Sequence, residues 1–177
     1  MHFLILFLLV YGVVLVQAAV IPVFLPHLPV VNLFVVLAVS LSLFRRDGEL
    51  IFWTLLLGFL VDRLSAFPLG FNAVLLPALA VFSRYLLRKI WGKAGIFSAV
   101  ALTGIGLAAY QIIVFLVRAL LDKKHEGVAD LLSSLPFAPA TILVSLLVNC
   151  FLAAPLFYLL LKSLNELFEY WEQKRKL

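Results

Sequence analysis

The feature that most constrains this chain is a series of long apolar runs, each close to the length of a membrane-crossing helix. Of the 177 residues, 65% are hydrophobic and only 13% are charged. A soluble domain of this size needs far more polar residues to cover its core. The runs are continuous and lack the short alternation of a membrane β-barrel strand, so they favour helices. The sequence therefore predicts an all-α, polytopic membrane protein.

Breaks in the apolar pattern divide the chain into six predicted transmembrane helices within one transmembrane domain at 1–177. The spans are expected at about 3–21, 30–44, 50–67, 69–87, 95–121 and 140–161. Roughly 20 apolar residues cross the hydrocarbon core of a bilayer. Prolines and short charged turns separate the runs, because proline interrupts a helix and charges stay among the headgroups. Residues 162–177 keep apolar residues at helical spacing, which predicts an amphipathic cytoplasmic tail.

The third run leaves two arrangements open, because a carboxylate interrupts it early. About 12 residues separate Leu50 from Asp62, and at 1.5 Å per residue they are too few to cross a bilayer. Either the helix crosses fully to about residue 67, with Asp62 and Arg63 near its outer edge, or it is a re-entrant half-helix. We favour the full crossing.

Basic residues indicate which side of the membrane each loop occupies. Ten of the 14 Lys and Arg fall in three segments that six crossings would place on one side. The third of these segments is the tail, and the first two hold Arg45, Arg46, Arg84, Arg88, Lys89 and Lys93. Because Lys and Arg accumulate in cytoplasmic loops, both termini are predicted to be cytoplasmic. The cluster at 84–93 is interpreted as a topology signal among lipid headgroups, with a cytoplasmic partner as the alternative.

Residues able to carry chemistry are sparse in the apolar runs, which argues against an enzyme. Asp62 is the clear acid at membrane depth, whereas an aspartyl-type membrane protease needs two. The three His fall in loops or at the terminus, and neither H-E-x-x-H nor G-x-S-x-G occurs. We therefore expect no catalytic residue, metal site or cofactor. The net charge of +5 follows the loops, so it does not indicate a nucleic-acid partner.

Polar and small residues interrupt the apolar pattern most densely between Gly58 and Val74. The residues singled out there are Gly58, Asp62, Arg63, Pro68, Gly70 and Asn72. Three interpretations of the charged pair remain open, of which the first is favoured: an ion pair at the membrane surface, a buried contact from Asp62 to the Gly70 turn or to Asn72, or a substrate or proton site. The first glycine is expected at a close helix contact and the second in a turn.

Further residues are expected to hold helices together. Gly104 and Ala108 give the fifth run a small-residue face that another helix can approach closely. Gln111 and Asn149 lie near the middle of the fifth and sixth runs. A hydrogen bond between those helices is favoured, and a partner protein or a ligand cavity are the alternatives. Asn32 opens the second run.

Together these residues resemble the rod shape-determining protein MreD family of bacteria. A Pro-containing break precedes Asn32 at the start of the second run. The core motif follows as Gly58-Phe59-Leu60-Val61-Asp62, and the next helix starts with Leu69-Gly70-Phe71-Asn72-Ala73 and has a basic end. Length and span number agree over nearly the whole chain, while the specific motif lies within 29–73.

The resemblance implies a function that composition does not show. MreD proteins are non-enzymatic inner-membrane components of the cell-elongation machinery, which is needed for rod shape and lateral peptidoglycan synthesis. The implied partners are MreC and, through it, MreB filaments and the synthase formed by RodA and a class B penicillin-binding protein. The family is also similar in architecture to the six-helix substrate-binding subunits of energy-coupling-factor transporters. The alternative function is therefore a subunit that binds a vitamin-like small molecule for a transporter.

Overall fold

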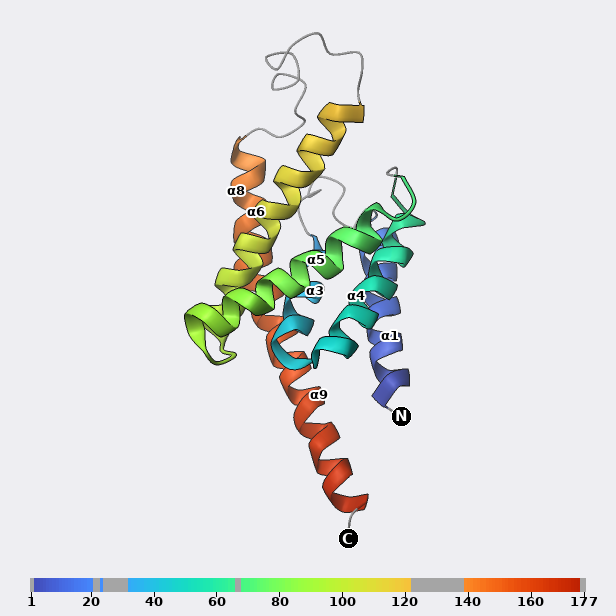
Figure 1. The fold of residues 1–177 in the computed structure, drawn as a ribbon, viewed down its shortest axis with the longest axis vertical. Helices are drawn as coiled ribbons and strands as arrows, with labels where there is room; N and C mark the ends of the chain where they lie inside the picture. The colour runs from blue at the N-terminus through green and yellow to red at the C-terminus, as the bar shows by residue number, and fades with distance from the viewer. Residues whose placement is uncertain (1, 21–22, 24–31, 66–67, 122–138, 176–177) are drawn as a thin grey trace.

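A computed structural model describes residues 2–20, 23, 32–65, 68–121 and 139–175, and the regular structure among them is all helical (Figure 1). The fold class predicted from the apolar runs is confirmed at this level. The proline-containing break after the first run, most of the loop before the sixth run and the last two residues of the tail lie outside the described residues.

The helices follow one another in the order of the apolar runs. Their bounds are α1 (His2–Leu15), α3 (Leu33–Phe44), α4 (Asp47–Asp62), α5 (Phe71–Leu86), α6 (Ile96–Leu121), α8 (Pro139–Val148) and α9 (Ala154–Arg175). Three π-helical turns extend or join them: η1 (Val16–Val20), η2 (Leu87–Trp91) and η3 (Asn149–Ala153). The π-helical turn η3 joins α8 to α9, and residues 162–175 of the predicted tail are part of α9.

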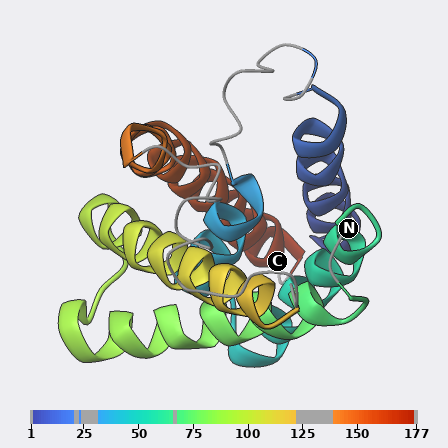
Figure 2. The same ribbon diagram turned by 90° about the horizontal axis from the view of Figure 1, so that it is seen from above.

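Helix α3 is the centre of the arrangement. It contacts α1, α4, α5, α6 and α9, and every residue from Val35 to Leu43 is buried. Figure 2 shows this short helix surrounded by the others when the molecule is seen from above. A helix that is apolar on all sides is expected to be enclosed by other helices, because it has no polar face to turn outward.

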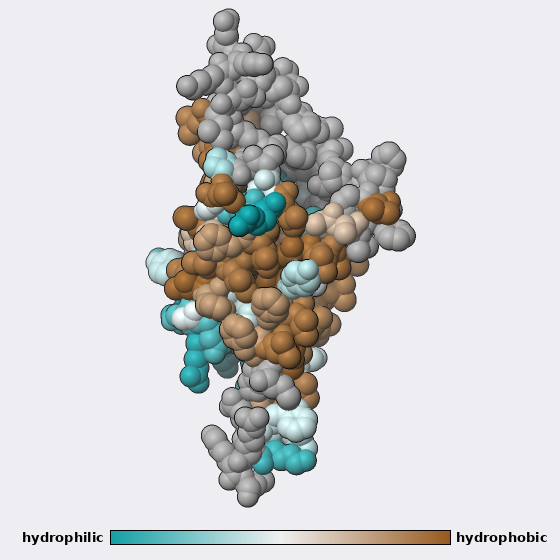
Figure 3. Space-filling view, turned by 90° about the vertical axis from the view of Figure 1, so that its right-hand side faces the viewer, coloured by the Kyte–Doolittle hydropathy of each residue, from teal (hydrophilic) through white to brown (hydrophobic). Residues whose placement is uncertain are grey.

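Two helices are long and apolar enough to cross a membrane, at 96–117 and 144–171 of the described residues. Two shorter apolar helices lie at 3–19 and 33–44. At 1.5 Å per residue, the 12 residues of α3 rise about 18 Å, which is less than the roughly 30 Å of a hydrocarbon core. Figure 3 shows apolar residues over the middle of one face, with hydrophilic residues toward the lower end.

Candidate functional site

The α4–α5 hairpin contains most of the residues singled out between Gly58 and Val74. Asp62, the last residue of α4, is 3% exposed. Its Oδ1 accepts hydrogen bonds from the backbone N–H and the side-chain Nδ2 of Asn72, both at 2.9 Å. Its Oδ2 accepts from the backbone N–H groups of Gly70 at 2.9 Å and Ala73 at 3.1 Å. One carboxylate therefore receives four hydrogen bonds from the start of α5.

This arrangement satisfies a general requirement of helix ends. The first N–H groups of a helix have no acceptor within the helix, and its N-terminus carries partial positive charge. Gly70, at the N-cap position of α5, has no side chain that could accept them. Asp62 supplies both the missing acceptors and a compensating negative charge, so a residue of one helix caps the next.

Two glycines allow the hairpin to close, for different reasons. Gly70 has φ of +97°, a left-handed conformation that residues with a Cβ rarely adopt. Gly58 lies where α4 meets the first turn of α5. A Cβ added at Gly58 would lie 2.5 Å from Ala73 Cα and 2.5 Å from the carbonyl oxygen of Asn72. The two backbones therefore approach more closely than any side chain at this position would permit.

Asn72 connects the hairpin to α6. Its side chain is fully buried, donates to Asp62 and lies 3.5 Å from Ser65 Oγ. Its Oδ1 accepts a hydrogen bond from the hydroxyl of Tyr110 at 3.0 Å. Sequence reasoning missed Tyr110, although a tyrosine within an apolar run needs a partner for its hydroxyl group and is a signal worth following.

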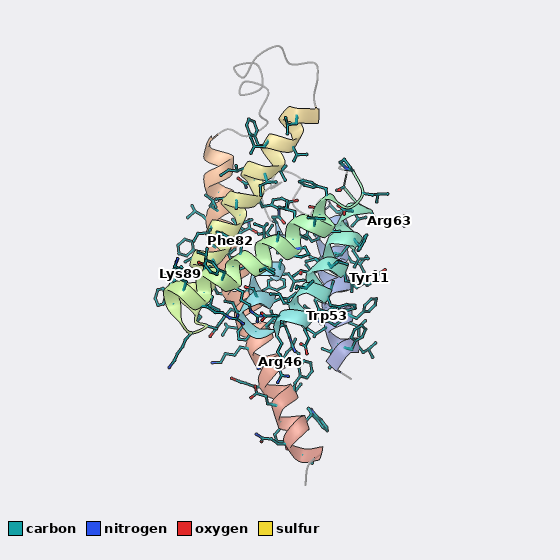
Figure 4. The ribbon with its side chains drawn as sticks, viewed as in Figure 1. Tyr11, Arg46, Trp53, Arg63, Phe82 and Lys89 are labelled. Atoms are coloured by element: carbon teal, nitrogen blue, oxygen red, sulfur yellow. The ribbon has the colours of Figure 1, made fainter. Side chains whose placement is uncertain are left out.

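The structure corresponds to the second interpretation of the charged pair, in which Asp62 makes a buried contact with Gly70 and Asn72. The four groups that donate to this carboxylate are all neutral. Arg63 is exposed, and Figure 4 shows it at the end of the hairpin opposite Arg46. Pro68 is also exposed, in the connection between the two helices. The favoured surface ion pair between Asp62 and Arg63 is therefore wrong.

A second polar cluster caps the N-terminus of α3. The Asn32 side chain accepts from the N–H of Val35 at 3.2 Å. The N–H of Asn32 donates to Oδ1 of Asn149 at 2.9 Å, and the N–H of Leu33 donates to Oε1 of Gln17 at 3.0 Å. Side-chain amides from η1 and η3 thus meet at the start of the central helix.

The expected hydrogen bond between Gln111 and Asn149 is not present among the described residues. Asn149 instead bonds to the start of α3, and its Nδ2 donates to the carbonyl oxygen of Ser145 at 2.8 Å. On the small-residue face of α6, a Cβ at Gly104 would lie 3.4 Å from Cys150 Sγ, which is ordinary contact. Ala108 is exposed, so this helix uses only part of the predicted face.

Basic residues join the α3–α4 turn to α5 and to η2, which follows it. Arg84 donates to the carboxylate of Asp47 and, at 3.2 Å, to the carbonyl oxygen of Ser42, while Arg88 reaches the same carboxylate at 3.3 Å. The hydrogen bond from Arg84 is the largest cause that lowers the pKa of Asp47. Arg46, Lys89 and Lys93 are exposed, and Figure 4 shows Arg46 below Trp53 and Lys89 at the left-hand end of the helical segment that contains α5.

Arg45 departs from the expectation that the charges of this turn remain among headgroups. It is only 8% exposed, and its guanidinium carbon lies 5.4 Å from the centre of the Phe168 ring. Burial lowers its pKa, and the nearby carboxylate of Glu49 opposes that effect.

The chemistry that these clusters can perform is mainly structural. The Asp62 cluster and the cluster at the start of α3 both use their polar groups to satisfy helix N-termini. The Asp62 carboxylate is therefore fully occupied by hydrogen-bond donors. Among the described residues, no group of three or more His, Cys, Asp or Glu side chains lies close enough to hold a metal ion. The chain matches no known family model, no curated protein and no solved structure.

Proposed function

We propose that this chain is a non-enzymatic, multi-pass adaptor of the bacterial inner membrane that works in the cell-elongation machinery. In this proposal the six helical runs cross the membrane, with both termini in the cytoplasm. The chain binds MreC and, through it or directly, RodA, a class B penicillin-binding protein and MreB. It supports lateral peptidoglycan synthesis by holding these partners in position.

The main support for the proposal is that the polar groups of the α4–α5 hairpin are already bonded to one another. The motif residues Gly58, Asp62, Gly70 and Asn72 bond or pack against one another and against Tyr110. A substrate or proton site would need a polar group that is available to a ligand, whereas the Asp62 carboxylate already accepts four hydrogen bonds. This bonding favours the interpretation that the hairpin is a rigid element whose outer surface contacts other helices.

The cap on α3 supports a membrane location. Hydrocarbon provides no water for a helix end, so the first N–H groups of a short enclosed helix need acceptors from the protein itself. Gln17, Asn32 and Asn149 provide them at the start of α3. Exposed apolar side chains on every long helix, such as Phe59 on α4 and Phe97 on α6, fit lipid or partner helices better than water.

The test is purification of the tagged chain from its native membrane in mild detergent, with identification of the bound proteins and small molecules. The proposal expects MreC and the wall synthase in stoichiometric amounts. Asp62→Ala should reduce the recovered MreC several-fold and make rod-shaped cells round, because the hairpin loses its cap. Arg63→Ala is the matched control, because Arg63 is next to Asp62 in the sequence and its exposed side chain should be dispensable.

Two results would overturn the proposal. One is normal cell shape and full MreC recovery with Asp62→Ala at wild-type membrane levels. The other is a transport ATPase or a vitamin-like ligand that copurifies with the chain in the absence of any wall protein.

A further inference from the structure

The end of α5, the turn η2 and the start of α6 form a basic surface, defined here as residues 82–97. Gly92, with φ of +67°, ends η2, and Lys93 follows it in the connection to α6. Most of the residues from 88 to 97 are exposed, including Lys89 and Lys93. Figure 4 shows Lys89 at the left-hand end of the helical segment that contains α5. Neither the α4–α5 hairpin nor the cap on α3 explains why these side chains project outward.

The positive charge of the basic surface is not compensated by the acids nearby. Residues 45–49 and 84–93, which contact one another, contain six basic residues and only two acidic ones. Asp47 already faces two arginines, and Glu49 lies 3.8 Å from a third. Among the described residues, the two lysines of the basic surface make no ion pair. Their charge is therefore available to an anion outside the chain.

Lys89 extends along an exposed aromatic side chain. Its Nζ lies 5.6 Å from the centre of the Tyr85 ring and 3.4 Å from the Tyr85 hydroxyl oxygen. Lysine and tyrosine side chains that combine an apolar body with a polar tip are typical of the boundary between lipid headgroups and acyl chains. An ammonium group has three N–H donors, so donors of Lys89 remain for an acceptor outside the chain. The pair therefore has the arrangement expected at a membrane surface.

Exposed apolar side chains flank the two lysines on both sides along the chain. Phe82 and Ile90 are exposed, and Phe97, in the first turn of α6, is 88% exposed. A small soluble anion would leave these side chains in water. A lipid leaflet covers them with acyl chains while its headgroups meet the adjacent cations. The combination of free cations and exposed apolar groups therefore favours an anionic lipid surface over a soluble anion.

We propose that the basic surface binds anionic phospholipid of the phosphatidylglycerol type in the cytoplasmic leaflet. Lipid phosphates accept hydrogen bonds from the ammonium groups of Lys89 and Lys93. Ile90 and Phe97 contact the acyl chains next to these headgroups. Two lysines thus bind lipid, while the arginines of the same segment hold the α3–α4 turn in place. The proposal rests on the membrane location and orientation given under the proposed function, and it is independent of any wall-synthesis partner.

The test uses the purified, delipidated full chain in a neutral detergent, with bound lipid counted by native mass spectrometry. Phosphatidylglycerol and phosphatidylethanolamine with identical acyl chains are titrated separately. We expect phosphatidylglycerol to bind about 25-fold more tightly, because each of two lysines near an anionic headgroup contributes about 5-fold. The preference should decrease as the ammonium acetate concentration rises, because salt screens exposed charges. Millimolar inorganic phosphate should not displace the lipid, because free phosphate lacks the apolar contacts.

Three double variants assign the preference to the two lysines. Lys89→Gln with Lys93→Gln should abolish the preference for phosphatidylglycerol, whereas Lys89→Arg with Lys93→Arg keeps the charge and should retain it. The matched control is Lys162→Gln with Lys174→Gln, which removes the same charge from exposed lysines of α9 and should leave the preference unchanged. All of these side chains are exposed, so each variant should unfold at the wild-type temperature, measured in the same detergent.

The competing outcomes are distinguishable from those of the proposed function, because no wall protein is present in the assay. Equal binding of both lipids by the wild type would overturn the inference, as would a preference that survives in Lys89→Gln with Lys93→Gln. An equal loss in the α9 control would show that total charge selects the lipid, and displacement by inorganic phosphate would show a simple anion site. If neither lipid binds, the inference is refuted, and an acidic surface of a partner protein is the occupant to examine.

Discussion

Replacement of Gly58 by alanine tests whether the close approach of α4 and α5 stabilises the fold. The added Cβ would meet three backbone atoms of α5: Ala73 Cα and Asn72 O at 2.5 Å, and Ala73 N at 2.7 Å. Carbon atoms in contact normally lie about 3.5–4.0 Å apart, so the new methyl group is about 1 Å too close. No side-chain rotation can relieve the overlap, because every atom that it meets belongs to the backbone.

The overlap can be relieved only if the start of α5 moves away from α4. Such overpacking typically costs about 1–3 kcal/mol of folding free energy. The same movement stretches the four hydrogen bonds to Asp62, which are 2.9–3.1 Å long, and weakens them by about 1 kcal/mol together. Alanine recovers about 0.5–1 kcal/mol of helix propensity relative to glycine. The net destabilisation is therefore about 2 kcal/mol.

The assay is thermal unfolding of the purified chain in one fixed detergent, followed by the loss of the monodisperse peak. For a chain of this length, about 2 kcal/mol lowers Tm by roughly 4–8 °C. Gly12→Ala is the control, because Gly12 lies within α1 and a Cβ there would meet nothing within 4 Å. Its Tm should be equal to or higher than that of the wild type. If Gly58→Ala unfolds at the same temperature as Gly12→Ala, the packing argument fails.

Two further substitutions test the polar contacts that join helices. Tyr110→Phe removes the hydroxyl that donates to Asn72, so we expect about 1 kcal/mol of lost stability and a Tm roughly 2–4 °C lower, whereas the exposed Tyr85→Phe should change Tm little. Asp47 has a lowered pKa in the folded chain, so its contribution to stability is present above its ordinary pKa of about 4 and is lost as pH falls through the lower folded value. The Tm difference between wild type and Asp47→Asn should therefore shrink from pH 7 to pH 3, and a constant difference would contradict this linkage.

The helical class and the hairpin could be predicted from local sequence, because both depend on patterns within about 20 residues. The apolar runs predicted helices, and the polar residues of 58–74 allowed a contact between Asp62 and Asn72 to be considered. The sequence favours the ion pair at the membrane surface instead. Adjacent residues on a helix do not face each other, and the start of α5 offers Asp62 four donors that Arg63 cannot match.

Longer-range contacts could not be predicted in the same way. The sequence places Arg45 among headgroups, yet its side chain is buried and lies against the ring of Phe168, on α9 far along the chain. Gln17 and Asn149 meet at the start of α3 only because this end of α3 lies near both η1 and η3. Each of these contacts depends on which helices are neighbours in space, and a single sequence does not contain that information. For the same reason, the hydrogen bond that the sequence predicts between Gln111 and Asn149 is not the one that Asn149 makes.

Among the described residues, two helix N-termini are capped by side chains from other helices, with different chemical groups. α5 receives the carboxylate of Asp62, and α3 receives the neutral amides of Gln17 and Asn149 in addition to its own Asn32. Hydrogen bonds to an ionised acceptor are roughly twice as strong as those between neutral groups. The α4–α5 hairpin is therefore held by one charged acceptor within a short segment, whereas α3 is held by weaker bonds to segments distant in sequence. If a partner changes the arrangement of the helices, the contacts of α3 with η1 and η3 should yield before the hairpin opens.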